Sequence, residues 1–93
     1  MAPLWIEELH ISPGVEEKIW VKHHVAVDEV FDVCVEDEDH WPRRRREGTM
    51  LVFGRTAAGR YLMVALAPRG PGIWTVAPAR PMTQTERRQY ARR

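Results

Sequence analysis

Arginine is the residue type in this chain best suited to act on an anion. All twelve Lys and Arg residues after position 40 are arginine. The planar guanidinium group forms paired hydrogen bonds with phosphate and carboxylate groups. Arg80 follows an apolar run, and Arg87 and Arg88 lie a few residues later in a segment crowded with cations. This pattern predicts a surface that binds an anionic partner.

The charge of the chain is divided between its two halves. Residues 1–39 hold eleven acidic residues and only two lysines, a net charge of −9, whereas residues 40–93 hold twelve arginines and two glutamates, a net charge of +10. Two solvated faces that attract each other within the fold would explain this division. A basic surface for nucleic acid or for an acidic partner also would, and we favour this second interpretation.

Other kinds of chemistry have weaker support in the sequence. The single cysteine, Cys34, cannot form an internal disulfide, and its place on an apolar helix face predicts a core position. The four histidines lack the spacing of metal ligands, so we expect no metal and no cofactor. The first residues lack the order of a signal peptide, and no apolar run approaches the roughly 20 residues of a membrane span. We therefore expect a cytoplasmic protein.

The hydrophobic pattern predicts the elements that must position these residues. Apolar residues at four-residue spacing indicate a helix over residues 15–23, and the i, i+3, i+4, i+7 pattern indicates a second helix from Val27 to Cys34. A capping box formed by Thr83 and Glu86 predicts the start of a third helix. The expected strands are residues 5–11, 49–55, 60–67 and 73–79.

These elements predict a single α+β domain spanning residues 1–93. Two N-terminal helices pack on a small antiparallel sheet, a three-stranded meander with a short N-terminal strand added, and a C-terminal helix closes the fold. Leu62, Val64 and Leu66 should share one face of the middle strand. Residues 36–47 are expected to form a charged loop. Pro78 predicts an edge position or the end of strand pairing.

Four blocks of the sequence resemble the BrnT-like toxins of type II toxin–antitoxin systems, within the RelE/ParE-like superfamily. In chain order the blocks are Lys22-His23-His24-Val25 with Asp28-Glu29-Val30, then Gly54-Arg55-Thr56 with Ala58-Gly59-Arg60-Tyr61-Leu62, then Ala79-Arg80, and finally Thr83, Glu86, Arg87, Arg88 and Tyr90. Three positions depart from the family pattern. His24 replaces a glycine, Ala26 replaces a Ser or Thr that would cap a helix, and Pro78 replaces a small polar residue.

The resemblance implies a RelE-like fold and a toxin that cleaves mRNA as a metal-independent endoribonuclease. It also implies a cognate antitoxin, expected to carry an acidic segment and a ribbon-helix-helix DNA-binding part, in a homodimer or a toxin–antitoxin hetero-oligomer. The candidate catalytic residues are His23 as acid or base, with Lys22, Arg80 and Arg60 as cations near the phosphate. The candidate RNA-binding residues are Arg87, Arg88, Tyr90, Arg43, Arg44, Arg45 and Arg46.

Each candidate also has a structural interpretation. His23 could be a hydrogen-bonded core residue, Arg60 a structural cation beside a turn, and Arg80 the partner of Asp28 or Glu29. Tyr90 is expected to pack on the sheet rather than to stack on a base. The chain as a whole could be a non-catalytic module that binds RNA, the ribosome or a protein. It could also be a toxin with another target, such as a topoisomerase, because a fold does not determine its target.

Overall fold

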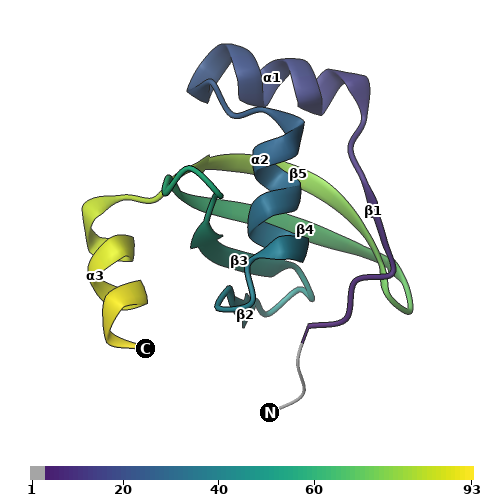
Figure 1. Cartoon of the computed structure of the whole chain (residues 1–93). Coiled ribbons are helices and arrows are strands. Elements are labelled where there is room, and N and C mark those ends of the chain that lie inside the picture. Colours follow the sequence, from purple (N-terminus) through teal and green to yellow (C-terminus); the bar gives the residue numbers. More distant parts are fainter. Residues whose placement is uncertain (1–3) are drawn as a thin grey trace.

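The structure, a computed structural model, describes residues 4–93 and confirms the predicted α+β class (Figure 1). Among these residues no helix is long and apolar enough to cross a membrane. In chain order the elements are β1 (Glu8–His10), α1 (Pro13–His23), α2 (Val27–Phe31), a π-helical turn η1 (Asp32–Glu36), β2 (Trp41–Arg44), β3 (Met50–Arg55), β4 (Tyr61–Gly70), β5 (Ile73–Pro81) and α3 (Gln84–Arg92).

The sheet is larger than the sequence predicted. The strand order is β1-β5-β4-β3-β2, and the antiparallel meander of β3, β4 and β5 is confirmed. The prediction of a small antiparallel sheet is wrong in detail, because β1 runs parallel to β5 and makes the sheet mixed. A parallel neighbour needs a long connection, and the segment that contains α1, α2 and the first three antiparallel strands provides it.

The charged segment 36–47 was wrongly predicted to be only a loop, since it contains the edge strand β2. Trp41 to Arg44 pair antiparallel with Phe53 to Met50. The Trp41 ring packs against the Phe53 ring, with 5.6 Å between the ring centroids. This tertiary contact, rather than an alternating apolar pattern, accounts for the strand, and an edge position tolerates Pro42.

The first helix begins two residues earlier than predicted. The sequence Ser12-Pro13-Gly14 starts α1: the Ser12 hydroxyl accepts a hydrogen bond from the Val15 N–H at 3.2 Å. Proline suits the first helical position because its missing N–H would have no partner there. The second predicted helix is confirmed, although its last turn widens into η1.

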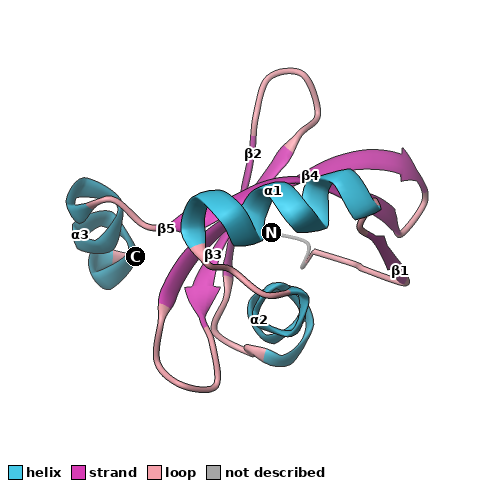
Figure 2. Ribbon diagram, turned by 90° about the horizontal axis from the view of Figure 1, so that it is seen from above, coloured by secondary structure: helices cyan, strands magenta, loops and turns pink. Residues whose placement is uncertain are grey.

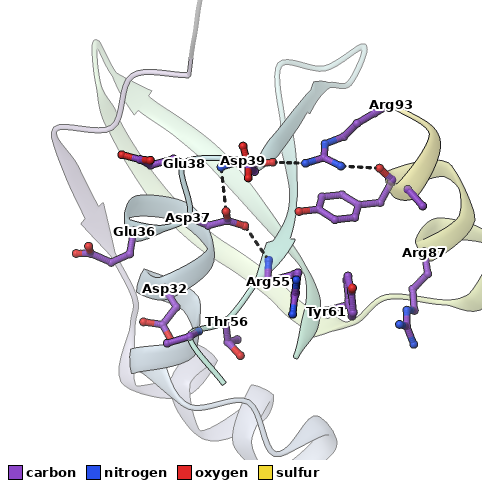
Figure 3. A pocket seen from close by; sticks show the side chains of 13 residues that line it. Asp32, Glu36, Asp37, Glu38, Asp39, Arg55, Thr56, Tyr61, Arg87 and Arg93 are labelled. Atoms are coloured by element: carbon purple, nitrogen blue, oxygen red, sulfur yellow. Dashed lines mark hydrogen bonds between the residues drawn. The ribbon is translucent and has the colours of Figure 1, made fainter. Parts of the chain in front are cut away.

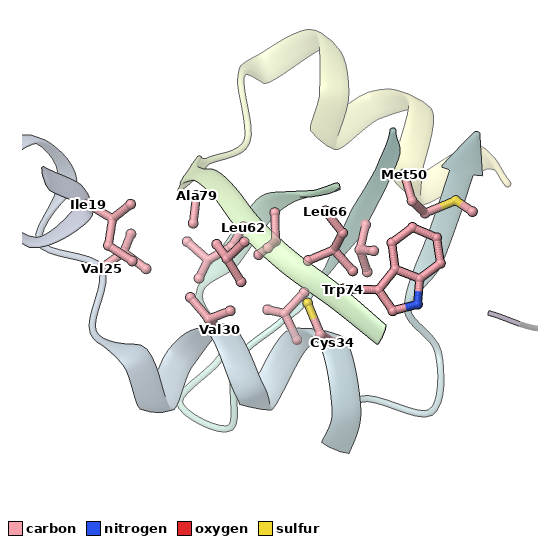
Figure 4. Close-up of a cluster of buried hydrophobic side chains, with 13 residues drawn as sticks. Ile19, Val25, Val30, Cys34, Met50, Leu62, Leu66, Trp74 and Ala79 are labelled. Carbon is pink, nitrogen blue, oxygen red and sulfur yellow. The ribbon is translucent and has the colours of Figure 1, made fainter. Parts of the chain in front are cut away.

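Helices cover both faces of the sheet, with α1 and α2 on one face and α3 on the other (Figure 2). The predicted alternation of β4 is confirmed. Leu62, Val64 and Leu66 belong to the core beneath α1 and α2, whereas Met63 and Ala65 belong to the core beneath α3. The larger core, beneath α1 and α2, is drawn in Figure 4; its members are Ile19, Val25, Val30, Val33, Cys34, Met50, Val52, Leu62, Val64, Leu66, Trp74, Val76 and Ala79.

The part of β5 that follows Thr75 does not pair with β1. Only Ile73–Thr75 pair with β1, and the register between β4 and β5 shifts where Val64 faces Ala79 and Leu66 faces Val76. Pro78 lies in this irregular stretch, as its missing N–H predicted. The exposed side of β5 at this point faces α1 and forms one wall of a pocket.

Candidate functional site

Two of the predicted catalytic residues share a pocket between α1 and β5. This pocket has a volume of about 370 Å³. Lys18 and Lys22 are four residues apart on α1, as are Ile19 and His23, so both pairs project from one side of the helix. His23 is half-buried, whereas Lys22 is exposed. The pocket therefore has a histidine and two lysines in its lining, which consists of Val15, Lys18, Ile19, Lys22, His23, Ala77, Pro78 and Ala79.

Arg60 holds the end of α1 and does not point into this pocket as a free cation. Its guanidinium donates hydrogen bonds of 2.8 Å to the carbonyl oxygens of His23 and His24, and it pairs with the Glu29 carboxylate at 3.0 Å. Carbonyl groups in the last turn of a helix lack internal partners, and a cation satisfies them well. Arg60 is thus brought to His23 through the backbone, in the structural role that the sequence left open.

His24 ends α1 in the left-handed conformation, with a φ of 52°. The family resemblance had placed a glycine here for that reason. Its ring packs edge-on against Trp20, with 5.2 Å between the centroids. Ala26 offers no side-chain cap to α2, as predicted, but the Ala26 N–H donates to the Glu29 carboxylate at 3.0 Å. Glu29 therefore serves both the start of α2 and Arg60.

Arg80 lies on the opposite face of the sheet from the pocket. It is paired in register with Met63, which belongs to the core beneath α3. Its guanidinium forms two hydrogen bonds with the Glu86 carboxylate, at 2.8 and 2.9 Å. These bonds raise the pKa of Arg80 and lower the pKa of Glu86. The structure does not bring Arg80 to His23, and its ion-pair partner is neither of the two acids considered from the sequence.

A second hollow, which we call the cleft, lies between residues 36–39, which we call the acidic segment, and α3. It has a volume of about 730 Å³. On one side Tyr61 stands between two arginines, with the guanidinium carbon of Arg55 at 5.1 Å and that of Arg87 at 4.2 Å from its ring centroid (Figure 3). The opposite side carries carboxylates; the acidic lining residues are Asp32, Glu36, Asp37, Glu38 and Asp39.

The turn between β3 and β4 lines the cleft with Thr56 and Ala57 and reaches the end of α1 through Arg60. The Thr56 N–H donates to the Arg60 carbonyl at 2.8 Å, and Gly59 supplies the positive φ of 92° in this turn. Arg60 reaches the end of α1 on one side of this turn, and Tyr61 faces α3 on the other. Figure 1 shows the turn lying between the end of α1 and α3.

Tyr90 packs on the sheet as expected. It is buried in the same core as Met82, and burial is the main cause that raises its pKa. Its ring meets Tyr61 edge-on at 6.0 Å between centroids, and Arg93 covers it at 3.9 Å. Tyr90 also lines the cleft, so it can pack on the sheet and still contact a ligand in the cleft.

The other predicted RNA-binding arginines line neither hollow. Arg88 donates to Thr85 on the exposed side of α3, at 3.3 Å. The four arginines of residues 43–46 are exposed. Arg43 stacks on Trp41 at 4.9 Å, and Arg45 pairs with Glu47 at 3.5 Å. Within residues 4–93 none of these four forms an ion pair with the acidic segment, which they could have neutralised.

Of the charged and aromatic residues that line the cleft, sequence reasoning named only Arg87 and Tyr90 as site candidates; it missed Arg55, Tyr61, Arg93 and the carboxylates of the opposite side. The positions of Arg55 and Tyr61 carried a usable signal. Arg55 ends one strand and Tyr61 begins the next across a short turn, and residues opposite each other in an antiparallel pair share a face. Arg93 offered no such pattern, because its place depends on how α3 packs. Among the described residues no three His, Cys, Asp or Glu side chains group as metal ligands.

Comparisons with known proteins identify the fold. The sequence matches no protein-family model, and a search of curated proteins finds no significant match. A solved structure is similar: the 1.1 Å crystal structure of the ribonuclease toxin BrnT from Brucella abortus superposes with a TM-score of 0.68. The match covers 83% of this chain and 97% of the toxin at 14% sequence identity. At that identity the likeness is one of fold, and this chain has the BrnT fold.

Proposed function

We propose that this protein is the toxin of a type II toxin–antitoxin system and that it cleaves mRNA as a metal-independent endoribonuclease. The observation that carries the proposal is the pocket that gathers His23, Lys18 and Lys22 against β5. It supplies the groups that phosphodiester cleavage needs, within a fold that is similar to that of a ribonuclease toxin. The protein would act in the cytoplasm, where mRNA is available.

The chemistry follows from the groups in the pocket. Histidine changes its protonation state near neutral pH and can accept a proton from the ribose 2′-OH. The 2′-oxygen then bonds to phosphorus and the bond from phosphorus to the 5′-oxygen breaks. That oxygen takes a proton from a water molecule, and the histidine returns its proton to the solvent. Lys22 and Lys18 would stabilise the charge that develops on the phosphoryl oxygens. The products are a 2′,3′-cyclic phosphate and a 5′-hydroxyl end.

Cleavage of a 5′-labelled RNA by the purified protein in EDTA tests this proposal. We expect products that end in a 2′,3′-cyclic phosphate, and a loss of at least about 100-fold in rate for His23→Ala, the usual contribution of an acid–base group. Lys22→Ala should lower the rate less. His10→Ala is a matched control, because His10 is exposed on β1 and bonds to Glu8 at 2.9 Å. Unchanged cleavage by His23→Ala would remove His23 from the mechanism.

A non-catalytic RNA-, ribosome- or protein-binding module is the second candidate, and one observation favours it. Two of the three predicted catalytic cations are already engaged, Arg60 with Glu29 and Arg80 with Glu86. A module of this kind would leave RNA intact at high protein excess and still bind it with strong salt dependence. That pair of results would replace the enzyme proposal.

An antitoxin partner is part of the proposed system. The edge strand β2 carries Arg43 and Arg44, and an acidic segment of the antitoxin would meet them with opposite charge. A ribbon-helix-helix part of the same partner would bind DNA. Co-expression with the product of any short gene that adjoins this one tests the proposal. We expect a stable complex that does not cleave RNA, and high salt should dissociate the complex and restore cleavage.

A further inference from the structure

The cleft carries chemistry that the proposed cleavage step does not use. Its volume of about 730 Å³ lies in the range of sites that hold small organic ligands. One wall is cationic and aromatic, with Arg55, Tyr61 and Arg87, and the other carries the carboxylates of Asp37 and Asp39 (Figure 3). A ligand that lies across the cleft must satisfy both walls.

The first wall suits a phosphate and a planar ring. Arg55 and Arg87 are held on Tyr61 by cation–π contacts. Within residues 4–93 neither guanidinium group donates a hydrogen bond to a protein acceptor, so their N–H groups are available to a ligand. Unstacked nucleobases stack on aromatic rings and on guanidinium planes, and guanidinium groups bind phosphate.

The second wall offers hydrogen-bond acceptors, and the Arg93 guanidinium lies beside them, donating to the Asp39 carbonyl oxygen at 2.8 Å. The Asp37 carboxylate is held in place, because it accepts hydrogen bonds from the Asp39 N–H at 2.9 Å and the Arg55 N–H at 2.8 Å. The Asp39 carboxylate accepts none from the part of the chain that the structure describes. Both carboxylates lie near Tyr90, where their charge adds to the effect of burial in raising its pKa.

We propose that the cleft binds one unstacked nucleotide of the RNA, with its phosphate on the arginine wall and the amino edge of its base on Asp37 and Asp39. Adenine and cytosine present an exocyclic amino group to such carboxylates. Uracil presents carbonyl oxygens on both sides of its one N–H, and these would face negative charge. The cleft therefore selects against uracil. This inference rests on the proposed function and adds a base preference to it.

Binding of uncleavable RNA tests the preference apart from catalysis. The probes are fluorescein-labelled tetranucleotides of A, C or U with 2′-O-methyl groups, which lack the 2′-OH nucleophile. We expect A and C to bind the wild-type protein roughly tenfold more tightly than U, in line with the value of one good base contact. Asp39→Asn should bring this ratio close to one. Arg87→Ala should weaken all three probes and reduce the salt dependence.

Glu47→Gln is the matched control. Glu47 is an exposed glutamate that pairs with Arg45 at 3.5 Å and does not line the cleft. This variant should keep the wild-type ratio, and circular dichroism would confirm that each variant is folded.

Three results would overturn the inference: equal binding of A and U by the wild-type protein, an unchanged ratio in Asp39→Asn, or no binding of any probe. The proposed function is judged separately, by cleavage of ordinary RNA with the same preparation. Cleavage without base preference overturns only the inference. Base preference without cleavage supports the inference and overturns the enzyme proposal.

Discussion

Arg80 and Glu86 join the end of β5 to the first turn of α3 through two parallel hydrogen bonds of 2.8 and 2.9 Å. Glu86 also accepts from the Thr83 N–H at 2.9 Å, and the Thr83 hydroxyl accepts from the Glu86 N–H at 3.1 Å. The predicted capping box is thereby extended across the chain to the sheet. Arg80 therefore fixes the direction in which α3 leaves β5. Because Arg87 lies on α3, this contact also positions Arg87 in the cleft.

We expect Arg80→Ala to lower the free energy of unfolding by about 1–2 kcal/mol at pH 7, the usual value of a partly exposed hydrogen bond to a charged group. The effect should depend on pH. Arg80 lowers the pKa of Glu86, so the stabilisation is present above the ordinary pKa of a glutamate and is lost as the pH falls through the lowered value. Urea unfolding of both proteins at pH 7 and pH 3 measures this. A difference that stays constant between these pH values would contradict the ion pair.

Gly54 allows the acidic segment to approach β3. A Cβ atom at this position would lie 2.7 Å from an oxygen of Asp37 and 3.0 Å from a methyl carbon of Val33. Gly54→Ala should therefore cost about 1–3 kcal/mol of stability, as overpacking does. Because Asp37 accepts from the Arg55 N–H, the substitution should also disturb the cleft.

Gly14→Ala is the control for this prediction. Gly14 lies in the first turn of α1, and nothing is within 4 Å of the site of its Cβ. Alanine should stabilise the helix there by up to about 1 kcal/mol. Thermal unfolding of both variants gives the comparison. Equal stability of the two alanine variants would show that the segment near Asp37 can move away without cost.

Local patterns were enough to predict the elements, but not the way in which distant elements meet. The faces of β4 and the capping box at Thr83 follow from periods of a few residues, and both are confirmed. The strand β2 exists because Trp41 packs on Phe53, a contact between distant parts of the pattern. For the same reason the sequence grouped His23 with Arg80, although alternation along β5 places Arg80 on the other face of the sheet.

Cys34 should be unreactive in the folded protein. It is 2% exposed in the core beneath α2, and burial raises the pKa of its thiol to about 12. Because the thiolate is the nucleophile, reaction with iodoacetamide at pH 8 requires unfolding. Mass spectrometry should find no adduct in buffer and one adduct in denaturing urea. Rapid labelling in buffer would mean that η1 opens locally. Cys34 lies in η1, the irregular π-helical turn at the end of the second helix.

His24→Gly should stabilise the end of α1 relative to His24→Ala. The residue has a φ of 52°, a conformation that glycine adopts freely and that costs other residues about 1 kcal/mol or more. Both variants lose the contact of the ring with Trp20, so the difference between them isolates the backbone term. We expect the free energy of unfolding, measured in urea, to be about 1 kcal/mol higher for the glycine variant than for the alanine variant. Since the His24 carbonyl, rather than its side chain, binds Arg60, both variants should keep the Arg60 contact and the position of His23. A glycine variant no more stable than the alanine variant would mean that α1 ends differently in solution.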